Sequence, residues 1–386
     1  MLVATKVRIY PAPEQVAFLE RQFGCVRYVW NRALEIKEHY YRHKAKNLSP
    51  FKDLKPLLAV AKRHEKYAWL KEADSMALQQ ALINLDRAYR NFFEKRSGKP
   101  RFKSKRGRQS SYHCVGVKVL DDAIKIPKCS PIKAVIHRPV EGEVKSITIS
   151  KEPSGKYYAS ILVEDGKRMP EPVKTLDTDR IVALDLGLEH FAVFNNGRVL
   201  ENPRHLKRAE ANLKRKQKQL SRKKKGSRNW HKARIKVANA HERLKNARAD
   251  TLHKWSRQLA DENQAVIVET LRVRNMMRNH RLAKHIGDAG WSLFVNMLEY
   301  KLKRQGKTLV RIDTWYPSSK TCSNCGYRMK EMPLSVRAWT CPSCGHAHDR
   351  DHNASLNLYR QGIVDLKANG FKLKAAGRSS PPVEAA

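Results

Sequence analysis

The chain has 386 residues, and its 78 Lys and Arg against 37 Asp and Glu give a formal net charge of +41 at pH 7. A positive excess of this size makes nucleic acid the first partner to consider, ahead of an anionic membrane, because a polyanion relieves the self-repulsion. The sequence has neither the roughly 18 consecutive apolar residues of a membrane span nor a secretory signal, so we expect a cytoplasmic protein without a membrane partner.

The first part of the chain, which overall is long enough for several domains, changes from a strand pattern to helices and back. Residues 2–10 alternate apolar and polar side chains, as a half-buried strand does. Residues 14–97 mostly space their apolar side chains at helical intervals. Short alternating runs separated by Pro, Gly, Asp and Ser follow. We therefore predict a small β-barrel from residues 1–13 and 98–170, with residues 14–97 as a helical insertion.

Two segments of this part are candidates for contact with nucleic acid. Gln79 and Gln80 lie off the apolar stripe of the predicted helix 75–93, where simple solvation and recognition of base edges are both open interpretations. The basic turn segment 98–106 contains one aromatic residue, Phe102. A solvated charge run and phosphate contact with base stacking are again both open. The candidate side chains of this segment are Lys99, Arg101, Phe102 and Lys103.

An apolar run at residues 181–187 carries one carboxylate, Asp185, near its end. Such an acid is either the exposed end of an ordinary strand or a metal ligand that projects from the centre of a sheet. Two short apolar runs follow, and they flank Asn195-Asn196-Gly197, a tight-turn signal for a hairpin. A strand with a central acid followed by a hairpin is how a ribonuclease-H-like fold begins.

The densest positive charge lies between residues 201 and 250, where there are 18 Lys and Arg against 4 Asp and Glu. Apolar residues still recur at helical spacing, and a basic run interrupts them. We predict two helices joined by this basic loop, with one face on a core and the other bare to a phosphate backbone. A coiled coil is the alternative, although its flanks should carry both signs of charge. The candidate loop residues are Arg222, Lys223, Lys224 and Lys225.

Four of the seven cysteines form two matched pairs separated by fifteen residues. Each pair places two thiolates on one tight turn, and two such turns close a tetrahedron around Zn²⁺. Four sulfur ligands fill the coordination sphere, so we predict a structural zinc site that needs neither His346 nor His348. An odd cysteine total argues against a disulfide framework. The predicted ligands are Cys322, Cys325, Cys341 and Cys344.

Two further segments end in carboxylates. The apolar run 265–268 ends at Glu269, and Asp349 and Asp351 stand just before a helix-like stretch. Taken singly, each is more simply explained as an ordinary acid at the end of an element. Together with Asp185, they supply hard oxygen ligands from separate elements, as a two-metal phosphodiester enzyme requires.

The order of these motifs resembles TnpB, a family of transposon-encoded RNA-guided nucleases related to the type V CRISPR effectors. The resemblance rests on Leu184-Asp185-Leu186-Gly187, Ile267-Val268-Glu269, the four-Cys element and Asp349-Arg350-Asp351-His352-Asn353-Ala354. It implies a multidomain α+β chain with a wedge-type barrel, a recognition part made of the inserted helices, and a RuvC-like α/β nuclease domain. The nuclease domain would span residues 171–316 and 347–362, the inserted zinc element 317–346, and a flexible tail 363–386.

The resemblance also implies a function. TnpB proteins bind a guide RNA made from the transposon's end, recognise a short motif beside the target, and cut both strands of double-stranded DNA. Asp185, Glu269 and Asp351 would hold two Mg²⁺ ions, with Asp349 as the alternative to Asp351, which directly precedes the Asn-Ala turn. An RNA-guided DNA binder that does not cut, and a transposase that joins strands with the same carboxylates, are the alternatives.

Overall fold

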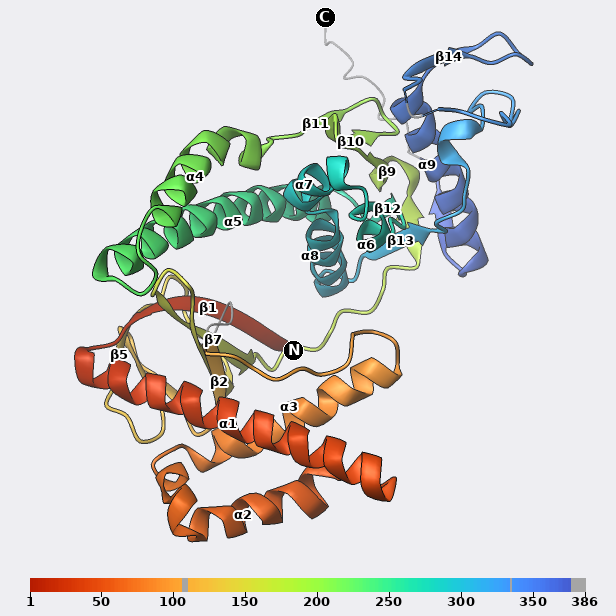
Figure 1. The fold of residues 1–386 in the computed structure, drawn as a ribbon. Coiled ribbons are helices and arrows are strands. Elements are labelled where there is room, and N and C mark those ends of the chain that lie inside the picture. Colours follow the sequence, from red (N-terminus) through yellow and green to blue (C-terminus); the bar gives the residue numbers. More distant parts are fainter. Residues whose placement is uncertain (106–109, 334, 376–386) are drawn as a thin grey trace, which may run out of the picture. The chain divides into compact units, whose positions relative to one another are not determined.

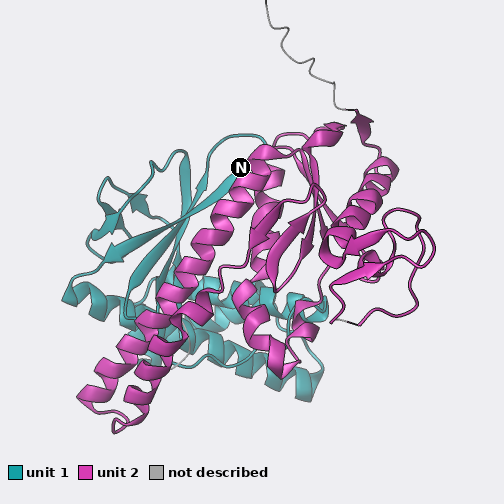
Figure 2. Cartoon of the chain, turned by 90° about the horizontal axis from the view of Figure 1, so that it is seen from above, with its two compact units in different colours: residues 1–168 teal, residues 169–386 magenta. Residues whose placement is uncertain are grey.

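The structure is a computed structural model that describes residues 1–105, 110–333 and 335–375 (Figure 1). It divides into two compact units, residues 1–168 and 169–386 (Figure 2). Both units contain helices and strands, so the prediction of a multidomain α+β chain is confirmed. None of the helices in the described ranges is both long enough and apolar enough to cross a membrane.

The first unit is built on a seven-stranded antiparallel sheet of order β2-β6-β7-β1-β5-β4-β3. Its strands are β1 (Leu2–Tyr10), β2 (Ser110–Cys114), β3 (Lys118–Val119), β4 (Ala123–Lys125), β5 (Ile132–Val135), β6 (Glu143–Lys151) and β7 (Tyr157–Glu164). The predicted strand over residues 2–10 is confirmed as β1, which pairs with β5 and β7. Within the described residues the sheet ends at β2 and β3, so a closed barrel stays a prediction.

Three α-helices lie between β1 and β2 in the chain: α1 (Pro13–Lys44), α2 (Lys55–Arg63) and α3 (Ser75–Phe93). A short π-helix, Pro50–Leu54, precedes α2, and a 3₁₀-helix, Glu65–Lys71, follows it. The side chain of Asp74 caps α3 by accepting a hydrogen bond from the Met76 N–H at 3.0 Å. In the predicted apolar stripe of α3, Leu78, Leu82 and Leu85 are buried in one core with the sheet, and Ala88 and Tyr89 are half-buried against it.

The second unit contains a five-stranded sheet of order β11-β10-β9-β12-β13. Its strands are β9 (Ile181–Leu186), β10 (His190–Phe194), β11 (Val199–Glu201), β12 (Ala265–Glu269) and β13 (Thr308–Ile312). β9, β12 and β13 are parallel, and the predicted hairpin is confirmed as the antiparallel pair β10 and β11. Central parallel strands are covered on both faces, which explains the continuous apolar runs in β9 and β12.

Helices cover both faces of this sheet. The helices of this unit are α4 (His205–Ser221), α5 (Arg228–Glu262), α6 (Val273–Met276), α7 (His280–Ala289), α8 (Trp291–Arg304) and α9 (Arg350–Ala368), of which α4 lies against α5 and not on the sheet. Successive β9 residues alternate between two cores: Val182 and Leu184 pack with α5 and α8, whereas Ile181 and Ala183 pack with α9. The prediction of two basic helices joined by a loop is confirmed by α4 and α5, which lie side by side (Figure 1).

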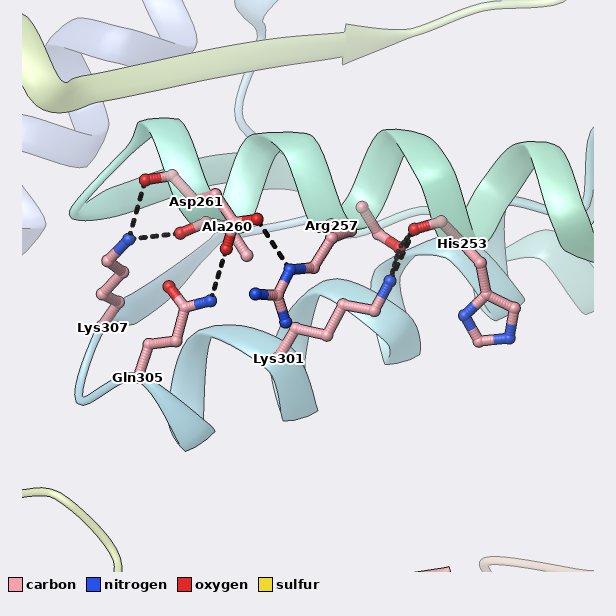
Figure 3. A network of polar contacts seen from close by, with 8 residues as sticks. His253, Arg257, Ala260, Asp261, Lys301, Gln305 and Lys307 are labelled. Carbon is pink, nitrogen blue, oxygen red and sulfur yellow. Dashed lines mark hydrogen bonds and ion pairs between the residues drawn. The ribbon is translucent and has the colours of Figure 1, made fainter. Parts of the chain in front are cut away.

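The C-terminal end of α5 is fixed to the α8–β13 segment by polar contacts (Figure 3). Lys307 donates to the backbone carbonyls of Ala260 and Asp261, which lie in the last turn of α5 and have no partner within the helix. Gln305 donates to the Asp261 carboxylate at 2.7 Å. Lys301 donates to the His253 carbonyl at 2.7 Å, and burial lowers the pKa of this lysine to about 8.

Helix α9 packs unusually close to the sheet. Gly362 in α9 faces Ile267 in β12, and a Cβ atom at this glycine would lie 2.4 Å from Ile267 Cδ1 and 2.8 Å from its Cγ2. Carbon atoms in ordinary contact are about 3.5–4.0 Å apart. The absence of a side chain at residue 362 therefore sets how near α9 can lie to β12.

The prediction of a flexible tail over residues 363–386 is wrong for residues 363–374. Helix α9 continues to Ala368, and β16 (Lys372–Lys374) pairs in parallel with β8 (Thr175–Asp177). Leu366 and Leu176 are buried in the same core as α9, so apolar burial holds this segment although its composition is polar. Residues 376–386 lie outside the described residues.

Candidate active site and metal centre

The predicted carboxylates Asp185 and Glu269 lie on neighbouring strands. Val268 in β12 is in register with Leu184 in β9, so the two acids are next in register along these parallel strands. Neighbouring strands are about 4.8 Å apart. Asp185 lies two residues after Ala183 and Glu269 two residues after Ile267, and both of these apolar residues belong to the α9 core, so both acids lie on the sheet face that α9 covers.

The two aspartates at the start of α9 have different partners. Asp349 is the N-cap of α9, and its Oδ1 accepts a hydrogen bond from the His352 N–H at 2.8 Å. Asp351 lies in the first turn, and its Oδ1 accepts a long hydrogen bond from Arg337 Nη1 at 3.4 Å. Asp349 is therefore occupied as a helix cap, whereas Asp351 has, among the described residues, one exposed arginine as its ion-pair partner.

The pKa values of Asp185 and Glu269 are both raised, and the charge of Asp351 contributes to both shifts. Burial raises the pKa of Asp185 well above its usual value, and the negative charges of Glu269 and Asp351 raise it further. Burial also raises the pKa of Glu269 to about 7, with the Leu186 backbone N–H opposing and Asp351 adding to the rise. Like charges that repel in this way favour either a shared proton or a bound cation. Three hard oxygen donors suit a divalent cation.

Two arginines beside these acids have no counterpart in the sequence predictions. Arg350 is buried, and its Nη1 donates to the backbone carbonyls of Pro333 at 2.7 Å and Val336 at 3.2 Å. Its charge acts on Asp185, where it lowers the pKa. Arg337 pairs with Asp351 and, at 3.6 Å, with Glu189. In a chain with 78 Lys and Arg, no spacing or composition signal singles out these two.

The four predicted zinc cysteines form one cluster, with all ligand atoms within 4.8 Å of one another. Each pair lies on a matched turn, in which the N–H of Gly326 or Gly345 donates to the carbonyl of the first cysteine at 2.9 Å. Both glycines have positive φ, at 79° and 72°, which a side chain would strain. Short strands β14 (Ala338–Thr340) and β15 (Ala347–Asp349) flank the second turn.

The sulfur spacing fits a tetrahedral metal. Sγ atoms of Cys322 and Cys344 are 3.7 Å apart, as are those of Cys325 and Cys341. A Zn–S distance of about 2.3 Å in a regular tetrahedron corresponds to sulfur atoms about 3.8 Å apart. These two distances match that geometry, so the cluster could hold a metal ion such as zinc.

His348 lies against this cluster. It is buried, its Nε2 is 3.0 Å from Cys322 Sγ, and its ring packs on Trp339 at 4.7 Å between centroids. Burial raises the pKa of the Cys322 thiol to about 11, whereas backbone hydrogen bonding, first from His346, lowers that of Cys344 to about 6. A thiolate at Cys322 would gain a hydrogen-bond donor from His348, so the histidine fits as a neighbour of the metal ligands.

The two glutamines predicted to contact nucleic acid lie on α3. Gln79 and Gln80 are both half-buried. The Gln80 amide donates to Asn84 Oδ1 at 3.2 Å, one turn further along the helix. The structure therefore places both glutamines on one helix beside the unit's core, and their contact with nucleic acid stays a prediction.

The predicted basic segment of residues 98–103 is fixed on α1. Trp30 Nε1 donates to the Arg101 carbonyl at 3.1 Å, and the Asn31 side chain makes two hydrogen bonds with the Lys103 backbone, at 2.9 and 2.7 Å. Lys103 Nζ lies 3.8 Å from the centre of the Trp30 ring, and Lys99 pairs with Glu38. The anchors were missed because nothing in the sequence marks these two α1 residues.

Phe102 is 59 % exposed, although the backbone around it is held. It lines a cavity of about 770 Å³ together with Trp69 and three arginines of α1, Arg21, Arg27 and Arg32. Aromatic and cationic side chains on one concave surface suit a nucleic-acid base and its phosphate.

In the second unit, residues 222–225 of the α4–α5 loop are all exposed.

Comparison with known proteins gives three family matches. Residues 160–280 match a family described as a probable transposase, OrfB of IS605. Residues 291–358 match the Cas12f1-like TNB domain. Residues 1–46 match a family described as a helix-turn-helix domain, although they fold here as β1 and the single helix α1.

Two relatives match over almost the whole chain. A protein of Streptomyces pristinaespiralis is 40 % identical over 94 % of this chain and 89 % of its own length. Its name, which was assigned by inference, is RNA-guided DNA endonuclease. InsQ of Escherichia coli strain K12, named in the same way, is 33 % identical over 95 % of this chain and 93 % of its own. The structure of a Cas12f1–sgRNA–target DNA complex superposes with a TM-score of 0.56 at 14 % identity, covering 93 % of this chain and 98 % of that one, which shows a shared fold.

Proposed function

Because the chain belongs to the TnpB family of transposon-encoded RNA-guided DNA endonucleases, we propose that it binds a guide RNA and cleaves double-stranded DNA at Asp185, Glu269 and Asp351. The observation that carries the assignment of the site is that β9 and β12 place Asp185 and Glu269 next to each other in register, where the charge of Asp351 raises the pKa of both. The three carboxylates come from β9, β12 and α9, which are far apart in sequence. The strand order of the five-stranded sheet supports a RuvC-like domain.

Asp351 is the better third ligand of the two candidates. It raises the pKa of both Asp185 and Glu269, whereas Asp349 acts weakly and only on Asp185. Asp349 also accepts the capping hydrogen bond of α9, which a metal ligand would have to give up in part. We therefore assign Asp349 to the helix cap.

Two kinds of metal site follow from the donor atoms. Two Mg²⁺ ions at the carboxylates would activate water and stabilise the departing oxygen of an in-line displacement. Asp185, Glu269 and Asp351 would hold these ions, because the sheet and α9 fix the positions of the three elements that carry them. The sulfur spacing supports one structural Zn²⁺ at the four cysteines, where no coordination position is left for water.

The remaining regions are proposed to hold RNA and DNA. Base pairing between guide and target would supply sequence specificity, so the protein needs mainly backbone contacts, and the +41 charge supplies them. We assign the exposed loop 222–225 to phosphate contact. Phe102 and its cavity are assigned to an unstacked base. Residues 1–13 and 98–170 would form the wedge, and 14–97 the recognition part.

The nuclease assignment is tested with the protein purified together with the RNA of its own locus. With a matching target plasmid and Mg²⁺, the wild-type complex should cut, and Asp185→Ala should lose cleavage while keeping guided DNA binding. Asp179→Ala removes an exposed acid just before the same strand and should cut normally. Normal cutting by Asp185→Ala would refute the site.

The products separate the alternative functions. Free double-strand breaks support the endonuclease, and joined DNA ends would instead indicate a strand-joining transposase. Guided binding by the wild type without any metal-dependent cleavage would indicate a regulator.

A further inference from the structure

Two buried side-chain amides of α9 form hydrogen bonds with the backbone of the four-Cys element. The side chains of Asn353 and Asn357 are 1 % and 2 % exposed. Asn353 Nδ2 donates to the Thr321 carbonyl at 2.8 Å, and its Oδ1 accepts from the Ser323 N–H at 2.8 Å. Asn357 Nδ2 donates to the same Thr321 carbonyl at 2.6 Å and to the Ser318 carbonyl at 2.8 Å.

These contacts surround a metal ligand. Thr321 and Ser323 are the residues on either side of Cys322, so the two amides hold the backbone before and after this cysteine. Buried amides that lose their partners are costly, and each of these contacts requires the turn to be in its folded position. The turn at Cys322 is itself closed around the cluster. The geometry of this turn and the positions of the two amides therefore depend on each other.

The same helix turn carries the proposed third carboxylate. Asp351 lies two residues before Asn353, in the first turn of α9. Arg350, between Asp349 and Asp351, adds a third link because its side chain and its backbone N–H bond to carbonyls at Pro333, Val336 and Arg337 in the four-Cys element. The start of α9 is thus tied to the element on both sides of Asp351.

We infer that Asn353 and Asn357 are positioning residues that transmit the folded, metal-bound state of the four-Cys element to Asp351. The metal at the cysteines then governs the geometry of a carboxylate that it does not touch. The consequence for cleavage rests on the function proposed above, whereas the coupling between the element and α9 is a property of the folded chain.

A purely space-filling role for the two amides gives a different result. Loss of core packing lowers the stability of the whole unit, whereas loss of a coupling changes one helix turn and breaks its response to the metal. The test therefore has to follow α9 itself, with the metal present and removed. Chelation of the wild-type protein needs no variant, so it decides the question even if a variant folds poorly.

Hydrogen–deuterium exchange of full-length, zinc-loaded protein gives this measurement, with zinc content measured in each sample. In the wild type, chelation should speed exchange of the amides of residues 350–358 by about tenfold or more. In Asn353→Ala/Asn357→Ala, exchange should already be fast with zinc bound, and chelation should add little. Asn369→Ala removes an exposed amide–backbone contact at the other end of α9 and should behave as wild type.

Unchanged exchange over residues 350–358 after chelation of the wild type would overturn the inference. So would wild-type protection in the zinc-loaded double variant. Both outcomes are read without DNA cleavage, so they stand whether or not the complex proves to be a nuclease.

Cleavage supplies a second reading. If Asp351 is displaced, the double variant should need about tenfold more Mg²⁺ for half-maximal cutting while guided DNA binding stays at the wild-type level. A wild type that cuts together with a double variant of unchanged Mg²⁺ requirement contradicts the inference alone. A wild type that does not cut contradicts the proposed function alone.

Discussion

The two candidate metal sites of the second unit are built in opposite ways. The cysteine cluster comes from two short turns whose spacing is visible in the sequence, and its sulfur atoms already stand at tetrahedral distances. The carboxylate centre comes from two strands and a helix that are far apart in sequence, and its members repel one another. With the proposed metal bound, the first site would stabilise its own fold, whereas the second is held together by the fold against its own charge.

The strongest test of this contrast is Asp185→Asn, which removes one charge and keeps the shape. Cleavage should fall by at least about a thousandfold, because a metal ligand is lost. An acid whose pKa is raised by folding destabilises the fold as pH rises above its unfolded value, so removing its charge stabilises the protein. Without Mg²⁺ at pH 7.5, the melting temperature should therefore rise by about 2–4 °C.

Calorimetry or fluorescence melting measures this shift. A lower melting temperature for Asp185→Asn than for the wild type, in the same Mg²⁺-free buffer, would show that the carboxylate is not held against its own charge.

The cysteine cluster should respond in the opposite direction. In Cys341→Ser the zinc content should fall, and residues 317–349 should become sensitive to proteases, because zinc binding supplies the folding energy of such elements. Cleavage should fall with it. Cys129→Ser replaces a buried cysteine of the first unit outside the cluster and is the matched control.

Mass spectrometry of the proteolytic fragments locates the unfolded part. Full protease resistance of Cys341→Ser after loss of zinc would mean that the element folds without its metal.

Gly362→Ala tests whether the carboxylate centre depends on how closely α9 packs. The new Cβ would lie 2.4 Å from Ile267 Cδ1, so α9 or β12 has to move. Overpacking of this kind costs about 1–3 kcal/mol of unfolding free energy, and the displacement of Asp351 should lower the cleavage rate as well.

Gly287→Ala in α7 is the matched control, because its Cβ would meet only Met277 Cε at an ordinary 3.8 Å. Urea denaturation compares the two variants. A Gly362→Ala variant that is as stable as the wild type, or more stable, would show that α9 accommodates a side chain at this position without displacement.

The smallest effect is the pH dependence of the metal requirement. Glu269 has a pKa of about 7, so Mg²⁺ must displace a proton from it below that pH. The Mg²⁺ concentration for half-maximal cleavage should fall by about tenfold per pH unit between pH 6 and 7 and level off above. A requirement that is flat across this range would contradict a shared proton at the carboxylates.

The sequence predicts the clustering of the four cysteines because it depends on spacing within one short element. Asp185 and Glu269 stand out because an acid follows an apolar run, but only the pairing of β9 with β12 brings them together. The choice of Asp351 over Asp349 rested on a resemblance in the sequence. Its physical reason, the capping bond of Asp349, needs coordinates.

The contacts that hold the centre in place could not be predicted. Asn353 and Asn357 form helix–turn contacts, and their partners Thr321 and Ser318 accept through backbone carbonyls, which carry no sequence signal. Gly362 resembles any other helical glycine until its neighbour on β12 is known. The segment from residue 363 has the polar composition of a tail, and its pairing partner, β8, lies nearly two hundred residues earlier, where no local pattern points to it.

Anomalous diffraction from crystals of the RNA complex grown with Mn²⁺ tests most directly whether divalent ions bind among Asp185, Glu269 and Asp351. We predict two peaks about 3.5–4 Å apart within coordination distance of these carboxylates, and none there in Asp185→Ala. Mn²⁺ peaks only elsewhere in the wild-type crystal, with the three carboxylates unliganded, would contradict the account.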